Sequence, residues 1–132
     1  WLAEAEPAQA ALLHVDLYDH EAAAPVLDSE AFYADCRRLL APGGLMAVNL
    51  FGRDASYEQS VQRIAAAFGA QQVWSLRPTR EGNTVVVAGR EVAVPARDAL
   101  SQRAANIEAR FSPLGLPARK WLRMVRPYEA SE

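Results

Sequence analysis

The chain has 132 residues, of which 51% are apolar, 23% charged and 8% aromatic, with a formal net charge of −2. This length suits one domain with a sizeable core. The near-balanced charge gives no electrostatic reason to expect nucleic acid or an acidic membrane as a partner, because both favour a basic surface. A single Cys cannot form an internal disulfide or a thiolate zinc site, and no apolar run approaches the roughly 20 residues of a membrane span. We therefore expect a cytoplasmic protein.

The first predicted element is a strand over residues 11–15, followed directly by Asp16. Because this stretch is apolar on both faces, we expect it to be buried within a parallel sheet. His14 is then expected to be a packed core imidazole rather than a ligand.

The next element is a helix that begins after Asp28 and Ser29, since either side chain can accept the unpaired N–H groups of a first turn. Apolar residues at helical spacing should face the sheet, namely Phe32, Cys36, Leu39 and Leu40. Residues 42–44, Pro-Gly-Gly, are expected to end this helix and turn the chain into a second buried strand over residues 45–51.

A second helix is predicted over residues 54–68, ended by Gly69. Residues 73–76 and 84–88 predict two strands, and the short polar turn between them makes an antiparallel pair. Residues 95–110 and 117–126 predict helices with Arg-rich faces that pack across the sheet.

The order of elements fits an open α/β sheet, mostly parallel, that ends in an antiparallel hairpin. The Gly-x-Gly-x-x-Gly turn that commonly binds a nucleotide-type cofactor in such sheets does not occur in the sequence. We therefore expect one partial domain over residues 1–132, with the sheet and its helices in residues 1–94 and a helical C-terminal extension in residues 95–132.

Two carboxylates, Asp16 and Asp19, follow the first predicted strand. The carboxyl edge of an α/β sheet is where ligands lie. An acid at this edge can accept a proton from an ammonium group, which is not a nucleophile until it is deprotonated, and can stabilise positive charge in a transition state. The alternative is that both acids cap backbone N–H groups of the loop.

A pattern of residues at these positions resembles the spermidine synthase family, a branch of the class I S-adenosylmethionine-dependent transferase fold. The pattern comprises Asp16-Leu17-Tyr18-Asp19, then Phe32-Tyr33, then Leu40-Ala41-Pro42-Gly43-Gly44-Leu45, and Asn49 at the end of the following strand. The resemblance covers about residues 1–88. It implies a Rossmann-like, methyltransferase-type open sheet, of which only the second half is present.

The resemblance implies roles for individual residues. Asp16 corresponds to the base that accepts a proton from the attacking amine, and Asp19 to the residue that holds the cationic amine. It further implies substrate binding by Tyr18, Tyr33 and Asn49, and cofactor binding by Asp16, Leu17 and Pro25. From the residues alone, Tyr33 can instead close the top of the sheet, and Asn49 can instead stabilise a turn.

The implied reaction transfers an aminopropyl group from decarboxylated S-adenosylmethionine to a small-molecule amine in polyamine biosynthesis, without a metal. Two alternatives stay open: a methyltransferase-like protein that uses intact S-adenosylmethionine, and a catalytically silent binding or scaffold domain. We expect residues 1–132 alone to be inactive. A homodimer is an expected partner state, because the first strand would be an apolar edge that a second copy can cover.

Overall fold

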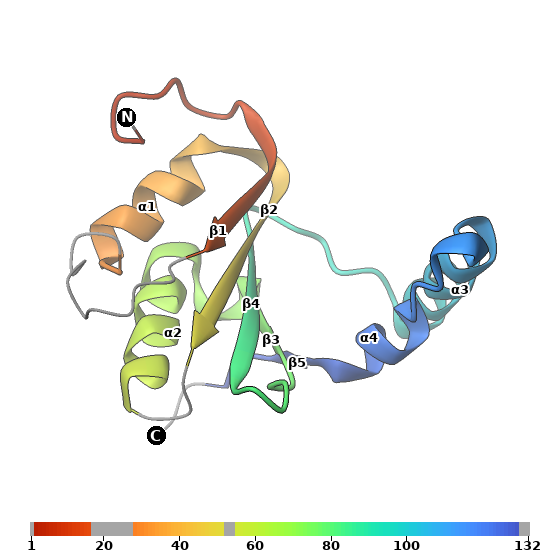
Figure 1. Cartoon of the computed structure of the whole chain (residues 1–132). Coiled ribbons are helices and arrows are strands. Elements are labelled where there is room, and N and C mark those ends of the chain that lie inside the picture. Colours follow the sequence, from red (N-terminus) through yellow and green to blue (C-terminus); the bar gives the residue numbers. More distant parts are fainter. Residues whose placement is uncertain (1, 17–27, 52–54, 130–132) are drawn as a thin grey trace.

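The computed structural model describes residues 2–16, 28–51 and 55–129. Within them, five strands form one sheet in the order β1-β2-β4-β3-β5 (Figure 1). The strands are β1 (Ala10–Asp16), β2 (Leu40–Phe51), β3 (Val73–Leu76), β4 (Asn83–Gly89) and β5 (Val125–Pro127). β1 and β2 pair in parallel, and the other three pairings are antiparallel. The predicted open α/β sheet and its antiparallel hairpin are confirmed.

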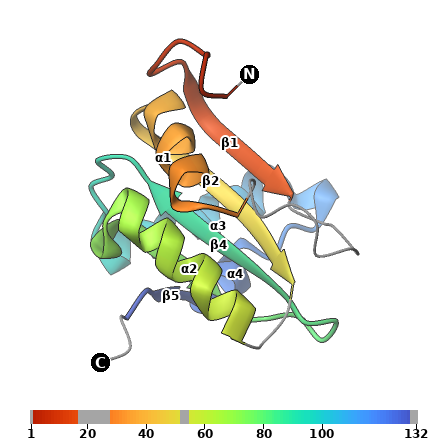
Figure 2. The ribbon, with the colours of Figure 1, turned by 90° about the vertical axis from the view of Figure 1, so that its left-hand side faces the viewer.

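Two helices, α1 (Glu30–Leu39) and α2 (Ala55–Phe68), cover one face of this sheet (Figures 1 and 2). A short 3-10 helix, η1 (Ala70–Gln72), leads from α2 into β3. Ser29 is the N-cap of α1, since its side chain accepts a hydrogen bond from the backbone N–H of Phe32 at 3.1 Å. No described helix is long and apolar enough to cross a membrane.

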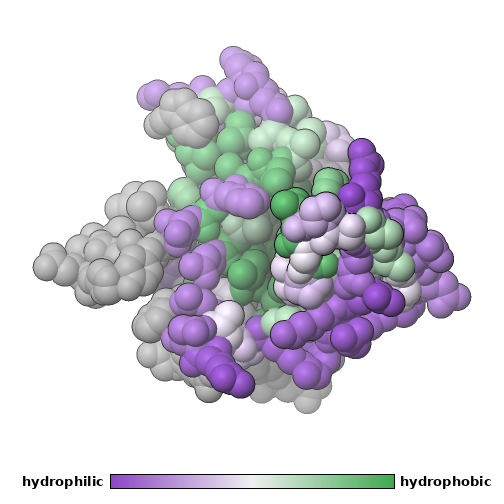
Figure 3. All heavy atoms as spheres, turned by 45° about the vertical axis from the view of Figure 1, so that its right-hand side comes forward, coloured by the Kyte–Doolittle hydropathy of each residue, from purple (hydrophilic) through white to green (hydrophobic). Residues whose placement is uncertain are grey.

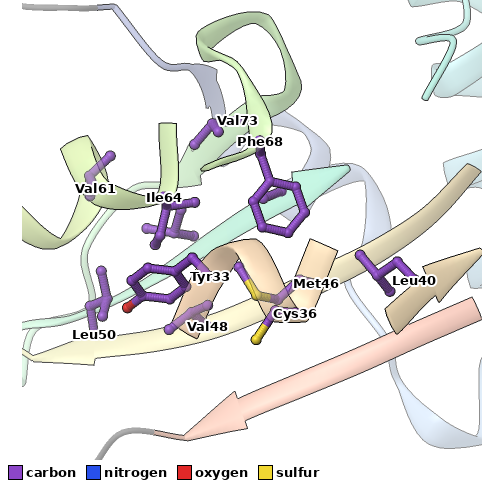
Figure 4. Packing of buried hydrophobic residues seen from close by; sticks show 12 residues of the cluster. Tyr33, Cys36, Leu40, Met46, Val48, Leu50, Val61, Ile64, Phe68 and Val73 are labelled. Atoms are coloured by element: carbon purple, nitrogen blue, oxygen red, sulfur yellow. The ribbon is translucent and has the colours of Figure 1, made fainter. Parts of the chain in front are cut away.

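The core lies between these two helices and the sheet (Figure 4). Alternate residues of β2 point toward the helices, because successive side chains of a strand face opposite sides. Its largest members, all fully buried, are Tyr33 and Cys36 of α1, Leu40, Met46 and Val48 of β2, Ile64 of α2, Val73 of β3 and Val86 of β4. The predicted core position of Cys36 is therefore confirmed.

β1 is buried on one face only, and the prediction that both faces are buried is wrong. Leu13 and Val15 pack against the core, whereas Leu12, His14 and Asp16 are exposed. The predicted burial of His14 is wrong for the same reason. Described helices cover the Leu13 side of the strand and leave the His14 side open.

The Pro-Gly-Gly sequence lies inside β2 and does not end α1, as we had predicted. The helix ends at Leu39, and the strand has already begun when the chain reaches Gly43. Gly43 has a φ of +80°, which favours glycine. A Cβ atom on Gly44 would lie 2.8 Å from the carbonyl oxygen of Ala41 and 3.0 Å from that of Ala10. The glycines therefore allow β1 and β2 to approach closely where their register shifts.

The C-terminal helices stand away from the sheet, whereas we had predicted that they pack across it (Figure 1). They are α3 (Arg97–Arg110) and α4 (Ala118–Met124), joined by the 3-10 helix η2 (Ser112–Leu114). We call residues 97–124 the arm. α3 packs mainly on α4, and the arm meets the sheet through α4 at β3. Residues 125–127, predicted as helix, form β5, because they pair with the free edge of β3.

The sheet face opposite α1 and α2 is consequently incompletely covered. We call it the open face. The register of the strands assigns to it Leu12, His14 and Asp16 of β1, Leu45, Ala47 and Asn49 of β2, Val85 and Val87 of β4, and Trp74 of β3. Figure 3 shows hydrophobic side chains gathered in the middle of this side of the molecule.

Candidate active site at the carboxyl edge of the sheet

Asp16 and Asn49 are neighbours at the carboxyl ends of two adjacent parallel strands. They are direct register partners, and Asn49 is in turn the partner of Val85 in β4. Paired residues of neighbouring strands lie about 4.8 Å apart and point to the same face of the sheet. Asp16 is exposed and Asn49 is half-buried, both on the open face. The fold therefore places a carboxylate beside a carboxamide at the edge where α/β proteins bind ligands.

The turn between β3 and β4 lies at the same edge of the sheet, since Asn83 pairs with Phe51 at the end of β2. Arg77 and Arg80 in this turn are exposed, and neither forms an ion pair among the described residues. The pKa of the Glu81 carboxyl is lowered by a backbone N–H group and by the Thr79 hydroxyl. The edge thus combines one carboxylate, one carboxamide and two guanidinium groups.

Four of the predicted site residues, Leu17, Tyr18, Asp19 and Pro25, lie outside the described residues. Their binding roles stay predictions. Of the three predicted site residues that are described, the structure brings together Asp16 and Asn49.

Tyr33 lies in the core between α1 and the sheet rather than at the open face (Figure 4). Its hydroxyl donates a hydrogen bond to Asp28 Oδ1 at 2.8 Å. Burial, followed by the contact with Asp28, raises the pKa of the Tyr33 hydroxyl well above its usual value. This position favours the alternative in which Tyr33 packs, and its predicted contact with a substrate stays untested.

Asp28 is the centre of a polar cluster that sequence reasoning noted only as a helix cap. Its Oδ2 accepts hydrogen bonds from Ser60 Oγ at 2.8 Å and from Arg63 Nη1 at 2.7 Å. Together with the Tyr33 contact, these bonds tie the start of α1 to α2. The capping pattern was the signal available in the sequence, but it does not say which of two adjacent polar residues caps and which bonds to another helix.

Cys36 is a buried thiol with little nucleophilic character. Burial, followed by the negative charge of Asp35, raises its pKa to about 12. The thiolate is the reactive form of cysteine, so the neutral thiol favoured here contributes packing.

Two arginines organise the opposite, amino edge of the sheet. Arg90 Nη1 donates a hydrogen bond to the carbonyl of Leu40 at 2.6 Å, and Arg38 donates to the carbonyls of Ala5 at 2.7 Å and Leu2 at 2.8 Å. These bonds hold the N-terminal segment and the α1–β2 junction. Arg90, considered from the sequence as a ligand for an anion, thus binds backbone.

The residues that the structure describes contain no group of three or more His, Cys, Asp or Glu side chains placed to hold a metal ion. The chemistry visible at the Asp16 edge is that of a single carboxylate with hydrogen-bonding neighbours.

Comparison with known proteins gives the class and then the family. No protein-family model matches the sequence. The structure is similar to that of a probable spermidine synthase from Corynebacterium glutamicum, with a TM-score of 0.57 and 19% identity over 99% of this chain and 51% of that one. It is also similar to that of a proposed DNA modification methylase from Thermus thermophilus, with a TM-score of 0.50 and 16% identity over 78% of this chain and 54% of that one.

These likenesses define the class: a mixed α/β open sheet, part of a Rossmann-like domain of the S-adenosylmethionine-dependent methyltransferase type. The sequence is 31% identical to a polyamine aminopropyltransferase from Chromobacterium violaceum over 98 residues, which are 74% of this chain and 37% of that protein. The chain belongs to the spermidine synthase family and represents part of its domain. It spans between about a third and about half of the length of these relatives.

Proposed function

We propose that this chain supplies the amine-acceptor side of an aminopropyltransferase-like active site, with Asp16 as the proton acceptor. The observation that carries the proposal is the register pairing of Asp16 with Asn49 at the carboxyl ends of β1 and β2. Membership of the spermidine synthase family supports the transfer of an alkyl group from an S-adenosyl sulfonium to an amine.

The donor in this reaction is a co-substrate, decarboxylated S-adenosylmethionine, whose sulfonium provides an electrophilic carbon and a neutral thioether leaving group. The acceptor amine uses its nitrogen lone pair to form the new C–N bond while the C–S bond breaks and its electrons pass to sulfur. The Asp16 carboxylate accepts the proton that the amine loses. Its negative charge also favours the cationic nitrogen of the transition state.

The neighbouring residues fit an amine ligand in type. The Asn49 side-chain carbonyl can accept an N–H hydrogen bond and orient the amine toward Asp16. Of the residues implied to contact the donor, Asp16 alone lies in the described part of the chain. A donor site built on this edge therefore also needs Leu17, Pro25 or groups from elsewhere.

A methyl transfer from intact S-adenosylmethionine is the second candidate. It is favoured by the structural likeness to the DNA modification methylase. Both candidates use the same carboxyl edge and differ in the donor consumed, so one assay separates them.

The test is a turnover assay of the protein with 1,4-diaminobutane and either donor, followed by mass spectrometry. Formation of methylthioadenosine indicates aminopropyl transfer, whereas formation of S-adenosylhomocysteine indicates methyl transfer. A general base typically contributes about 10²- to 10⁴-fold to the rate. Asp16→Asn should therefore reduce turnover by about that factor with an unchanged thermal transition.

Glu58→Gln is the matched control, because Glu58 is an exposed acid on α2, which covers the opposite sheet face. It should leave turnover unchanged. Because the chain spans only part of its relatives, calorimetric titration with methylthioadenosine and with each donor accompanies the assay. Binding of none of these compounds, together with no turnover, would remove the enzyme proposal and favour a scaffold domain. Turnover that survives in Asp16→Asn would remove Asp16 as the base.

A further inference from the structure

Two apolar surfaces of this chain are exposed and separate from each other. The first is the open face, where Leu12 is 57% exposed and Trp74, Val85 and Val87 are only half-buried. β1 is the edge strand, so within the described residues its outer backbone groups have no strand partner. Edge strands of this kind readily pair with or pack against another chain.

The second surface is on the arm. Four large apolar side chains project from it into solvent: Ile107 at 41% exposure, Phe111 at 40%, Leu114 at 68% and Trp121 at 43%. Within the arm only Ala104 and Ala118 are buried. Aromatic and large aliphatic side chains grouped in this way are typical of protein–protein contacts.

The arm holds its own shape. Glu108 accepts hydrogen bonds from the backbone N–H of Arg119 at 3.0 Å and from Arg119 Nε at 2.6 Å, which join α3 to α4. Residues 90–96 form an extended connection from β4 to α3 without helix or strand. A preformed helical pair on such a connection can be placed on a neighbouring molecule without being refolded.

The charges of the two parts are opposite. Residues 1–94 contain 7 Lys or Arg against 12 Asp or Glu, a net charge of −5, whereas residues 95–132 contain 7 against 4, a net charge of +3. Opposite net charges favour contact between the arm of one copy and the sheet of another, and disfavour contact of like parts.

The exposed area is also larger than a compact monomer needs. The chain exposes 8857 Å². A compact monomer of this mass is expected to expose about 6,800 Å². The excess, about 2,000 Å² per chain, exceeds the roughly 800 Å² that each partner buries in a standard interface.

We propose that two copies of this chain exchange arms, so that the arm of each copy covers the open face of the other. The exposed apolar residues of α3, η2 and α4 then replace water on β1, β2 and β4. The contact is reciprocal, which gives a closed dimer with two equivalent interfaces. This inference rests on surface chemistry alone and is independent of the proposed reaction.

The test uses sedimentation equilibrium on single-site variants of the two surfaces. Leu12→Glu places a charge on the open face, and Leu114→Glu places one on the arm; both side chains are exposed, so neither change should prevent folding. Wild type should be a dimer at micromolar concentration, and each variant should dissociate at least tenfold more readily. Gln59→Glu adds the same charge on exposed α2 and should leave the dimer unchanged.

Mixing the two variants distinguishes arm exchange from other dimers. An equimolar mixture of Leu12→Glu and Leu114→Glu should regain dimer, because one wild-type arm still meets one wild-type face. A dimer that survives in Leu114→Glu points to face-to-face contact, and one that survives in Leu12→Glu points to arm-to-arm contact; each overturns the proposal. A monomeric wild type, or a mixture that stays monomeric, also overturns it.

A photo-crosslinking residue at position 114 provides a second measurement that does not depend on affinity. In a mixture of ¹⁴N- and ¹⁵N-labelled protein, crosslinks from position 114 to β1 or β2 peptides should join chains of different label. Crosslinks confined to chains of one label would show that the arm folds onto its own sheet, and would contradict the exchange.

Discussion

The body of the molecule, which comprises the sheet with α1 and α2, and the arm differ in what keeps their helices in place. α1 and α2 bury Tyr33, Cys36, Ile64 and Phe68 against the sheet, whereas the arm buries two alanines. Most helical stability in proteins comes from tertiary packing of an apolar face. The comparison teaches that the body is stabilised by burial, and that the arm depends on local bonds and on whatever covers its apolar side chains.

The largest effect that separates the two regions should come from truncating one isoleucine in each. Ile64 is fully buried and Ile107 is 41% exposed. Ile64→Ala leaves a cavity in the core and should lower the free energy of unfolding by about 2–5 kcal/mol. Ile107→Ala should change it by less than about 1 kcal/mol in the monomer. Urea unfolding of both variants measures the difference, and equal losses would show that the arm shares the core of the body.

A smaller effect should come from the polar cluster between α1 and α2. Asp28→Ala removes the acceptor of the Tyr33 hydroxyl, of Ser60 and of Arg63, and leaves the Tyr33 hydroxyl buried without a partner. We expect a loss of about 2–3 kcal/mol in the same unfolding measurement.

Tyr33→Phe is the control for that cluster, because it removes the donor and keeps the ring. In the Tyr33→Phe background, Asp28→Ala should be less damaging by about 1 kcal/mol, since no hydroxyl is left unpaired. The same loss in both backgrounds would show that the Tyr33–Asp28 bond does not contribute to joining the two helices.

The smallest effect should be a loosening of the arm in acid. The pKa of the Glu108 carboxyl is lowered, first by the backbone N–H of Arg119 and then by its side chain. A carboxyl whose pKa is lower in the folded state stabilises that state above the unfolded pKa, and this contribution is lost as pH falls through the folded pKa. The arm should therefore lose amide-exchange protection at acidic pH, below the usual Glu pKa of about 4.3, before the body does.

Glu108→Gln provides the control for the acid effect. Its arm should already be less protected at neutral pH and should change little on acidification, as measured by hydrogen exchange and mass spectrometry. If the variant and the wild type loosen over the same pH range, then Glu108 is not the group responsible.

Much of the body could be predicted from sequence because its signals are local and periodic. The first strand, both helices of the body and the β3–β4 hairpin follow from apolar spacing, from Ser29 as a cap and from the glycine after Phe68. The pairing of Asp16 with Asn49 was within reach for the same reason, since both end predicted parallel strands. The family resemblance, which the comparisons confirm, rested on those positions.

The sequence did not predict which surfaces stay uncovered. His14 and Leu12 occupy an apolar segment, and their exposure depends on the arm standing away from the sheet. β5 was predicted as helix because its pairing with β3 is a long-range contact without a local signal. The role of Asp28 likewise depends on α2, which lies about 30 residues further along the chain.

The sequence by itself therefore determined the elements, the acidic edge and the family, because helix periodicity, capping and strand patterns are encoded within a few neighbouring residues. Only the tertiary structure decided that one sheet face stays open and that Tyr33 belongs to the core. It also decided that the C-terminal helices form an arm. These outcomes depend on packing between distant segments, where burial of one surface is settled by the position of another.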